Sequence, residues 1–474
     1  MCSIEDDGEI RPVKDDSSQS LQGRKCVKCD QPGVLVTRIH DCFCRSCFQV
    51  YVIHKFRAAI GKSKLIREGE HVLLAFSGGA NSAALLHLIQ DGLSERAHRK
   101  LRFIPTIVHI DESGILGVSS DARQELRRKI ARLLLKSGFP AYIVDLEQAV
   151  DIERKKVTQI GTGYVNGECG CVIHRVEDEN NSAVVDTSQS DKLRSLIDSV
   201  NSVTSQEDFI RHLRNQLITC IARQLGFSKV LTAECSTRLS IQILTDIAQG
   251  RGSQISLNTA FCDQRNGDVL FVRPVRDLNA KELTMYNALF EVGSVFIPSI
   301  TTKTTTDSSI ERLTETFVCG LQADFSSTVA NIVRTSEKLE TPNLEDRQTC
   351  AFCRSHLDTN VGKASALYAI EFSQRISQAG QKTSTSCHGD YTGCQDGGPG
   401  QSSCCGPDSS SRKRAYNRRE LDSVLCYGCR VTMQNFNFEK SSLPNMIEQE
   451  LAARKSSEEM LREQISEFLL EDDS

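Results

Sequence analysis

The sequence has no long apolar run and no excess of positive charge. No stretch approaches the roughly 18 to 20 consecutive apolar residues that cross a bilayer, so no membrane partner is expected. The acidic N-terminus, Met1–Asp7, lacks the apolar segment of a secretory signal and the arginines of a transit peptide, which favours the cytosol or nucleus. With a net charge of −4, the surface cannot be positively charged throughout. A nucleic-acid partner would therefore have to bind to a local basic segment or to another subunit.

What the chain does contain is typical of a globular protein. With 474 residues, of which 39% are hydrophobic and 25% charged, it is long enough for two or three structural units. Its 20 cysteines are many for a reducing compartment, where thiols rarely form stable disulfides. Because several of them occur as CxxC pairs, they are better interpreted as metal ligands.

The character of the sequence changes several times along the chain. Residues 1–23 are polar and aperiodic, as expected of a disordered tail, whereas residues 24–50 are cysteine-rich. Residues 51–300 alternate strand and helix patterns around a polar insertion at 150–205. The C-terminal region, 301–474, contains a low-complexity loop at 376–412 and ends in an amphipathic helix at 445–471. We expect the apolar stripe of that helix to dock on the chain's own core: Leu461, Ile465, Phe468 and Leu469.

Short apolar runs and helical periodicities follow each other through the middle of the chain. The predicted strands are 71–76, 104–110, 141–146, 229–234 and 269–275. The predicted helices are 83–90, 119–137, 207–225, 238–248, 280–292 and 308–337. Because buried strands that alternate with helices form parallel sheets, the predicted fold class is α/β, with a doubly wound parallel sheet.

A glycine-rich loop joins the first predicted strand to the first predicted helix. Gly78 and Gly79 allow the backbone to approach an anion closely, and the helix beyond supplies free N–H groups. Hydroxyls of Ser77 and Ser82 are further donors for phosphate. The alternative is a tight turn with Asn81 or Ser82 as helix cap, but ligands bind at the carboxyl ends of strands in doubly wound sheets.

The loop resembles the Ser-Gly-Gly-x-Asp-Ser signature of PP-loop ATP pyrophosphatases, which adenylate a carbonyl oxygen and release pyrophosphate. The resemblance implies a sheet of PP-loop ATP pyrophosphatase type, with a nucleotide site at Ser77, Gly78, Gly79, Asn81 and Ser82. The family's Asp, associated with Mg–pyrophosphate chemistry, is here Asn81, whose amide has no charge to offset a divalent cation. This replacement is compatible with ATP binding, but it argues against adenylation by this chain.

Three further motifs resemble the cytoplasmic tRNA 2-thiolation protein two family: Thr232–Leu239, Gln249–Gly252 and Arg273–Leu278. The catalytic sister subunit of that family's complex has two acidic residues where this chain has Thr237 and Arg238. The resemblance implies a cytoplasmic subunit that is not catalytic by itself. Its partners would be the PP-loop sister, tRNA and a ubiquitin-related carrier that donates sulfur to the wobble uridine.

Two alternatives to this function remain open from the sequence. One is a self-sufficient PP-loop tRNA sulfurtransferase or adenylase. The other is a zinc-stapled, tRNA-binding adaptor whose nucleotide site is vestigial.

An N-terminal metal site is predicted from two CxxC pairs in a short window. Four thiolates from two such pairs form the tetrahedral set that is typical of structural zinc: Cys26, Cys29, Cys44 and Cys47. Cys42 lies just before the second pair and is an alternative ligand to Cys44.

A second zinc site is predicted from pairs that lie far apart in the sequence: Cys350, Cys353, Cys426 and Cys429. The segment between them would be a loop closed by the metal. A site of four thiolates has no open coordination position, so neither site is expected to catalyse a reaction.

Three other cysteines are candidates for carrying sulfur as a persulfide, as core cysteines of the sister subunit do. Cys235 lies near the carboxyl edge of the predicted sheet and is the one catalytic candidate, while Cys169 and Cys171 lie in the insertion. The favoured alternative is that all three are ordinary thiols, because no acid–base companion is visible beside them.

The densest basic run precedes Cys426 and is the predicted RNA-binding segment: Arg412, Lys413, Arg414, Arg418 and Arg419. Tyr416 lies within it and can stack on a base. A smaller basic patch is Arg127-Arg128-Lys129 on a predicted helix. A solvated loop or a nuclear-localisation signal is the alternative.

Overall fold

A computed structural model describes residues 24–37, 41–97, 100–150, 174–176, 187–302, 304–339, 348–357, 373, 418–437 and 443–465. Two compact units account for the chain. The first comprises Met1–Asn343 and Val431–Gln449, and the second comprises Leu344–Arg430 and Glu450–Ser474.

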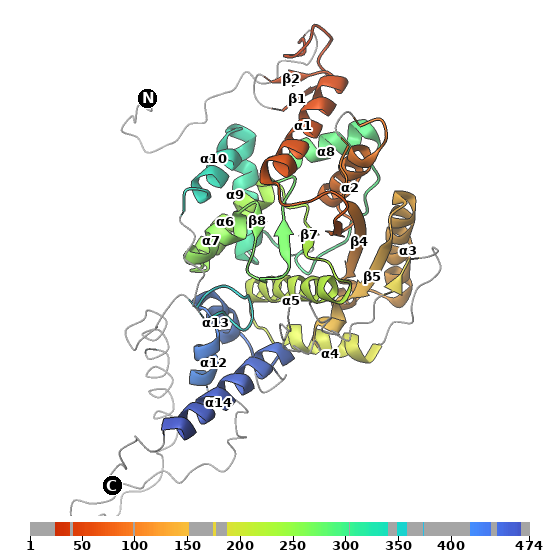
Figure 1. The fold of residues 1–474 in the computed structure, drawn as a ribbon. Helices are drawn as coiled ribbons and strands as arrows, with labels where there is room; N and C mark the ends of the chain where they lie inside the picture. Colours follow the sequence, from red (N-terminus) through yellow and green to blue (C-terminus); the bar gives the residue numbers. More distant parts are fainter. Residues whose placement is uncertain are drawn as a thin grey trace, which may run out of the picture. The chain divides into compact units, whose positions relative to one another are not determined.

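A seven-stranded sheet with the order β6-β5-β4-β3-β7-β9-β8 organises the first unit (Figure 1). Its strands are β3 (His71–Ala75), β4 (Ile104–Asp111), β5 (Ala141–Asp145), β6 (His174–Arg175), β7 (Lys229–Leu231), β8 (Cys262–Asp263) and β9 (Leu270–Val272). The five central strands pair in parallel, as predicted. The edge strands β6 and β8 were not predicted, and both pair antiparallel with their neighbours, so the sheet is mixed.

Helices follow most strands of this unit. They are α1 (Arg45–Ser63), α2 (Ala80–Leu93), α3 (Ser120–Ser137), α4 (Thr187–Asp198), α5 (Val203–Gln224), α6 (Ser236–Ala248), α7 (Ile255–Thr259), α8 (Ala280–Phe290), α9 (Ile310–Asp324) and α10 (Thr328–Ser336). A short hairpin of β1 (Leu35–Val36) and β2 (Cys42–Phe43) precedes α1. The described part of this unit also contains 3-10 turns at Ser113–Leu116, Leu146–Ala149 and Gly252–Gln254.

The alternation of side chains along β3 explains how the sheet is covered on both faces. Val72 and Leu74 are fully buried in one core cluster with residues of α1, α2 and α8. Leu73 is also fully buried, although it points to the opposite face. Helices α1 and α8 lie side by side, and α9 and α10 pack on α6 (Figure 1).

Two predicted segments differ in the structure. The helix predicted at 308–337 is two helices, α9 and α10, because Phe325 takes an extended conformation (φ −122°, ψ 90°) that ends α9. Within the segment 150–205, residues 187–198 form α4, whose Leu193 and Leu196 are buried.

The second unit contains α12 (Arg418–Val424), and the boundaries between the units fall within α13 (Tyr427–Gln434) and α14 (Asn445–Ile465). The predicted helix at 445–471 is thus described as far as Ile465, and Phe468 and Leu469 lie outside the described residues. Among the described residues, none of the helices combines the length and apolar character needed to cross a membrane.

Candidate functional site

The glycine-rich loop lies at the carboxyl end of β3, where the sequence predicts it. Gly78 has φ +84°, a left-handed conformation that residues with a side chain rarely adopt. A Cβ atom there would also lie 2.5 Å from Cδ1 of Ile130 and 3.1 Å from Cδ1 of Ile297. Gly78 is therefore required both by the backbone and by the packing of the loop.

The first turn of α2 begins at this loop with Gly79 as N-cap. No side chain of the described part of the chain caps it by a hydrogen bond, so its first N–H groups remain available to an anion. Ser82 is buried and donates to the carbonyl oxygen of Gly79 at 2.9 Å, while Ser77 donates to Ser82 at 3.1 Å. The two hydroxyls thus stabilise the loop itself, and only Ser77 is exposed.

The loop lies at the switch point of the sheet. From β3 the chain continues to β4 and β5 on one side and then returns to β7 and β9 on the other. At such a point the helices diverge and leave a crevice beyond the strand ends. The N-termini of α2 and α6 lie at this point of the described chain, and Asn81 Nδ2 donates to Cys235 Sγ between them at 3.3 Å.

Cys235 is the N-cap residue of α6 and has no exposed surface. Burial raises the pKa of its thiol, so the sulfur is protonated and unreactive near neutral pH. Cys235 therefore adjoins the predicted nucleotide loop, but its environment is that of a packed thiol.

The segment after α8 covers part of the loop. Val295 N donates to the carbonyl oxygen of Gly78 at 2.8 Å, and Asn287 Nδ2 on α8 donates to the carbonyl oxygen of Ala80 at 2.7 Å. Between the inward residues Val295 and Ile297, the ring of Phe296 is 75% exposed. An aromatic ring therefore faces solvent next to the loop.

The two positions where the resemblance expects acids have structural partners. Thr237 Oγ1 accepts from the backbone N of Ala280 at 3.0 Å. Arg238 forms ion pairs with Glu311 at 2.8 Å and with Glu315 at 3.4 Å, both on α9. These side chains hold α8 and α9 in place and provide no carboxylate at the crevice.

Two acids at the carboxyl ends of β4 and β5 are neutralised by α3. Asp111 accepts from Arg123 at 3.0 Å and from Arg127 at 2.9 Å, and Asp145 pairs with both arginines. Glu147 accepts from Arg123 at 2.8 Å. The sequence-based placement of Arg127 in a surface patch was wrong, because Arg127 is buried among these acids. The helical periodicity of α3 was the signal that could have shown it, since Arg127 lies on the same face as Ile130 and Leu134.

A second buried ion pair explains the Gln249–Gly252 motif. Arg251 is only 2% exposed and forms an ion pair with Asp208. It also contacts His212 Nε2 at 2.9 Å and donates to Thr432 Oγ1 at 3.1 Å. Arg251 therefore stabilises the first unit, and a role in ligand binding is not needed to explain it.

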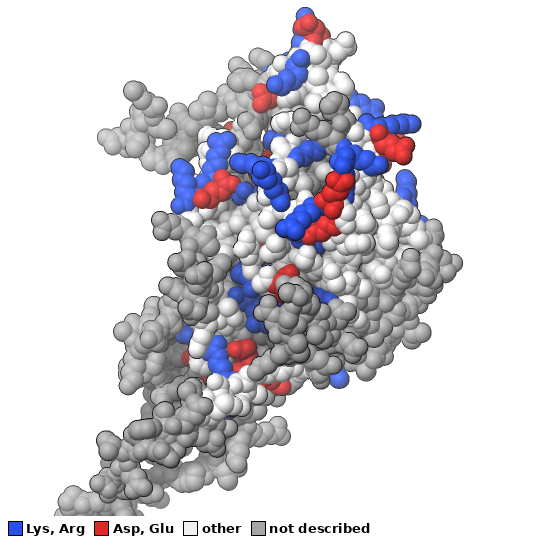
Figure 2. Space-filling view, in the orientation of Figure 1, with Lys and Arg blue, Asp and Glu red and all other residues white. Residues whose placement is uncertain are grey.

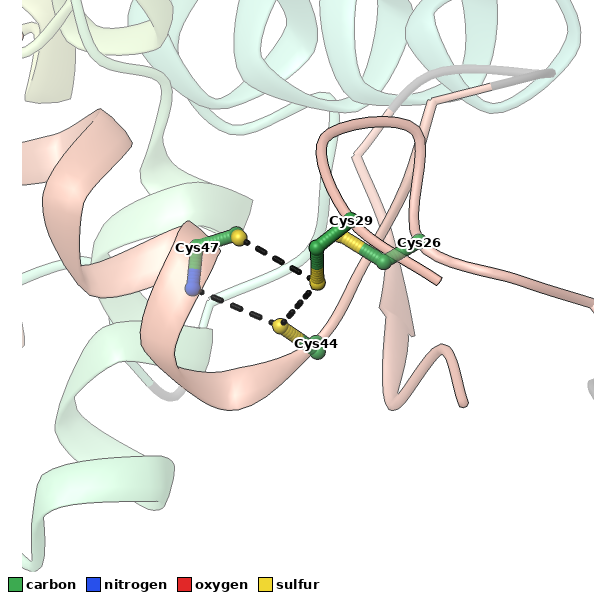
Figure 3. Close-up of side chains that lie close together, drawn as sticks. All are labelled: Cys26, Cys29, Cys44 and Cys47. Carbon is green, nitrogen blue, oxygen red and sulfur yellow. Dashed lines mark hydrogen bonds between the residues drawn. The ribbon is translucent and has the colours of Figure 1, made fainter. Parts of the chain in front are cut away.

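The N-terminal cysteines converge as predicted (Figure 3). The Sγ atom of Cys29 lies 3.6 Å from those of Cys44 and Cys47, and all four sulfurs of the set with Cys26 lie within 4.8 Å of one another. Four thiolates at about 2.3 Å from one ion are about 3.8 Å apart, so the set fits a single tetrahedral ion. The converging set includes Cys44, whereas Cys42 is buried in β2 and is not part of the set, so this geometry favours Cys44 as the ligand.

The local structure orients these thiols. Cys44 is the N-cap of α1 and accepts from Cys47 N at 3.5 Å. Hydrogen bonds from the Ser46 hydroxyl and from this N–H group lower the pKa of Cys44 to about 6. A helix N-terminus thus favours the thiolate that a metal ion requires.

The second predicted set converges within the second unit. The Sγ atoms of Cys350, Cys353, Cys426 and Cys429 lie within 4.8 Å of one another, and all four residues are buried. Cys353 and Cys426 are 3.5 Å apart although they are distant in sequence. This set also fits one tetrahedral ion.

The predicted RNA-binding run is only partly described. Arg412, Lys413 and Arg414 lie outside the described residues, as do Cys169 and Cys171, and Arg418 and Arg419 begin α12. Figure 2 shows one face of the molecule, on which Lys and Arg side chains lie close to Asp and Glu side chains.

The strand order and the loop at the end of β3 define the class of the protein. It is an α/β protein of PP-loop ATP pyrophosphatase type that also carries two sets of four cysteines suited to metal binding.

Comparison with known proteins identifies the family. A model of the family Cytoplasmic tRNA 2-thiolation protein 2 matches residues 309–431. The chain is 38% identical over 527 aligned positions to cytoplasmic tRNA 2-thiolation protein 2 of Xenopus tropicalis, covering 100% of this chain and 99% of that protein. It is 34% identical to the protein of that name from Homo sapiens, with 92% of each chain covered. The chain therefore belongs to the cytoplasmic tRNA 2-thiolation protein 2 family.

Among solved structures, the chain is similar to the U34-tRNA thiolase NcsA from Methanococcus maripaludis with its 4Fe-4S cluster. The TM-score is 0.49 and the sequence identity 13%, with 73% of this chain and 96% of that chain covered.

Proposed function

We propose that this chain is the second subunit of a cytoplasmic complex that places sulfur on the wobble uridine of tRNA. A catalytic PP-loop sister subunit would adenylate the uracil, and a ubiquitin-related carrier would donate the sulfur. This chain would supply the partner face, a tRNA-binding surface and two structural metal modules. Its membership of the tRNA 2-thiolation family along its whole length supports this function.

The observation that carries the proposal is the replacement of acids at the switch point. The loop keeps the shape of an anion site, with Gly78 in the left-handed conformation and an uncapped first turn of α2. Asn81, however, is an amide bonded to Cys235, and Arg238 pairs with α9. Proteins usually hold Mg²⁺ through one or two carboxylates together with substrate phosphates, so the replacement of these acids favours binding of a nucleotide over its adenylation chemistry.

The metal ligands support structural sites. Four converging thiolates favour zinc, held by Cys26, Cys29, Cys44 and Cys47 in one unit and by Cys350, Cys353, Cys426 and Cys429 in the other. When bound, the ion would fix the chain on both sides of the hairpin β1–β2 and at the start of α1. Without an open coordination position, it would take no part in sulfur transfer.

The domain plan follows from the same proposal. We place a tail at 1–23, a zinc module at 24–50, a PP-loop-like domain at 51–300 and a C-terminal region with the second zinc module at 301–474. The basic run Arg412, Lys413, Arg414, Arg418 and Arg419 remains a proposed contact for tRNA phosphates.

A zinc-stapled adaptor with a vestigial nucleotide site is the second candidate. It is favoured by the contact of Val295 with Gly78 and by the engagement of Ser77 and Ser82 within the loop. A self-sufficient PP-loop thiolase is disfavoured, because Asn81, Thr237 and Arg238 provide no carboxylate for a metal ion.

Pyrophosphate release separates the three functions. The assay would use the chain alone, the chain with tRNA, and the chain with tRNA and the sister subunit, each with and without ATP-binding competitors. We expect release only when the sister is present, and more release with this chain than without it. An adaptor with a vestigial site would bind no ATP in equilibrium dialysis, and substantial release by the isolated chain would establish a self-sufficient enzyme.

A further inference from the structure

The solvent face of α3 carries a row of basic residues. Only one of them, Lys129, belongs to the patch 127–129 that was predicted from the sequence. Lys129, Arg132 and Lys136 are all exposed and lie at positions i, i+3 and i+7, which is one line along a helix. Lys129 and Lys136 have no ion-pair partner within the described residues. The opposite face of α3 is buried, so this row points to solvent.

The row lies beside the segment that covers the glycine-rich loop. Leu133 is the helical neighbour of both Lys129 and Lys136, four residues after the first and three before the second. Its Cδ2 atom lies 3.2 Å from the position of a Cβ atom on Gly293. Phe296 follows three residues later and is 75% exposed. The helix that carries the lysines therefore contacts the segment that carries the exposed aromatic ring.

Three acidic residues of the described chain lie on α3 and at the end of α8. Glu125 on α3 pairs with Arg128 at 3.2 Å. Asp121 is exposed at the N-terminal end of α3, and Glu291 is exposed at the end of α8. Lys129 lies in the middle of α3 and Lys136 in its last turn, on either side of Leu133, which lies against Gly293.

We propose that Lys129, Lys136 and Phe296 form an RNA-binding surface, in which the lysines contact phosphates and Phe296 stacks on an unpaired base. Ammonium groups along a helix neutralise phosphates without regard to sequence, and an exposed aromatic ring beside them is the usual platform for a single-stranded base. An acidic protein segment would use the lysines but would gain nothing specific from Phe296. The inference rests on the proposed function, since it assigns part of the tRNA contact to this face of the sheet domain.

The test measures tRNA binding by the full chain with fluorescence anisotropy over a series of salt concentrations. The double variant Lys129→Gln/Lys136→Gln is compared with Lys62→Gln/Lys338→Gln, which removes two exposed lysines elsewhere. Lys62 lies in the last turn of α1 just as Lys136 lies in the last turn of α3, so both variants alter a helix end alike. Phe296→Ala is compared with Phe317→Ala, which truncates a ring that is 56% exposed on α9.

We expect the α3 double variant to bind tRNA more weakly and to reduce the slope of log affinity against log salt by about 1 to 2. Phe296→Ala should weaken binding about 5-fold or more with the slope unchanged, while both control variants bind as the wild type does. Equal affinities and slopes for the α3 and control variants would overturn the inference, provided that thermal unfolding shows all of them folded.

Two further outcomes are informative. If the wild-type chain binds no tRNA, the proposed tRNA contact fails together with this surface, whereas a wild type that binds and variants that match their controls refute the surface alone. If the lysine variants weaken binding of polyglutamate as much as of tRNA and Phe296→Ala affects neither, the surface recognises an acidic protein and the RNA assignment is wrong.

Discussion

The side-chain amide of Asn81 donates a hydrogen bond to the thiol of Cys235 at 3.3 Å, and this contact joins the N-terminal ends of α2 and α6. The two helices follow the adjacent parallel strands β3 and β7, and between these strands the order in which the chain adds strands to the sheet reverses. At the point where a PP-loop enzyme is expected to hold a metal-bound pyrophosphate, this chain has a neutral amide and a buried thiol. Neither group in this contact carries a negative charge that could offset a divalent cation.

Restoring the acid at position 81 should not restore catalysis. In Asn81→Asp the new carboxylate lies beside Cys235, and Thr237 and Arg238 still stand at the two other positions where the resemblance expects acids. We expect pyrophosphate release by the isolated variant to stay at the level of the wild type, with tRNA and Mg²⁺ present. Asn81→Ala serves as the control for loss of the hydrogen bond to Cys235. If Asn81→Asp releases pyrophosphate and Asn81→Ala does not, the prediction is wrong, and Asn81 alone accounts for the lack of adenylation activity in the isolated chain.

Cys235 should react slowly with alkylating reagents in the folded chain. It has no exposed surface, whereas Cys319 on α9 is exposed. Burial raises the pKa of both thiols, so access rather than acidity should separate them. In a time course with excess iodoacetamide, followed by peptide mass spectrometry, we expect Cys319 to be fully modified before Cys235 is detectably labelled. Early labelling of Cys235 would instead support a role as sulfur carrier.

Loss of one ligand should remove one metal ion. Cys44 belongs to the N-terminal set and Cys42, two residues earlier, does not. We expect the wild type to contain about two metal ions per chain, Cys44→Ser about one, and Cys42→Ser as many as the wild type. Elemental analysis of the purified chain, refolded with zinc where needed, gives these ratios. If both variants lose the same amount of metal, Cys42 would also have to be a ligand.

The two cysteine sets and the position of the loop could be predicted because their signals are local. A CxxC spacing places two thiols near one point, and two glycines between a strand and a helix mark a close approach of backbone to an anion. Each pattern is complete within a few residues, so it can be recognised without knowing which distant segments lie beside it in the fold. Even the distant pair Cys350 and Cys426 was found in this way, since each belongs to its own CxxC.

What could not be predicted depends on contacts between distant segments. Arg127 looked like part of a surface patch because charge usually means solvent, but Asp111 and Asp145 come from other elements to neutralise it. The antiparallel edge strands β6 and β8 have two residues each, too few to show a pattern. The contact of Asn81 with Cys235 joins residues that are 154 positions apart.

Protonation of Asp111 should destabilise the fold in acid. Burial alone would raise the pKa of this carboxyl group, but Arg123 and Arg127 outweigh burial and lower it from 3.8 to about 2. Because the folded pKa lies below the unfolded one, the ionised group stabilises the fold above about pH 4, and this contribution is lost as the pH falls toward about 2. The shift corresponds to about 2 kcal/mol.

In the variant Asp111→Asn, the side chain at position 111 no longer ionises, and the buried Arg123 and Arg127 lose one of their carboxylate partners. We expect its thermal midpoint, followed by circular dichroism, to lie below that of the wild type at pH 7 and the difference to shrink as the pH falls from 4 toward 2. Asp277→Asn replaces an exposed carboxylate and should track the wild type at every pH. A difference between Asp111→Asn and the wild type that stays constant over this range would mean that packing, and not the charge of Asp111, stabilises the carboxyl ends of β4 and β5.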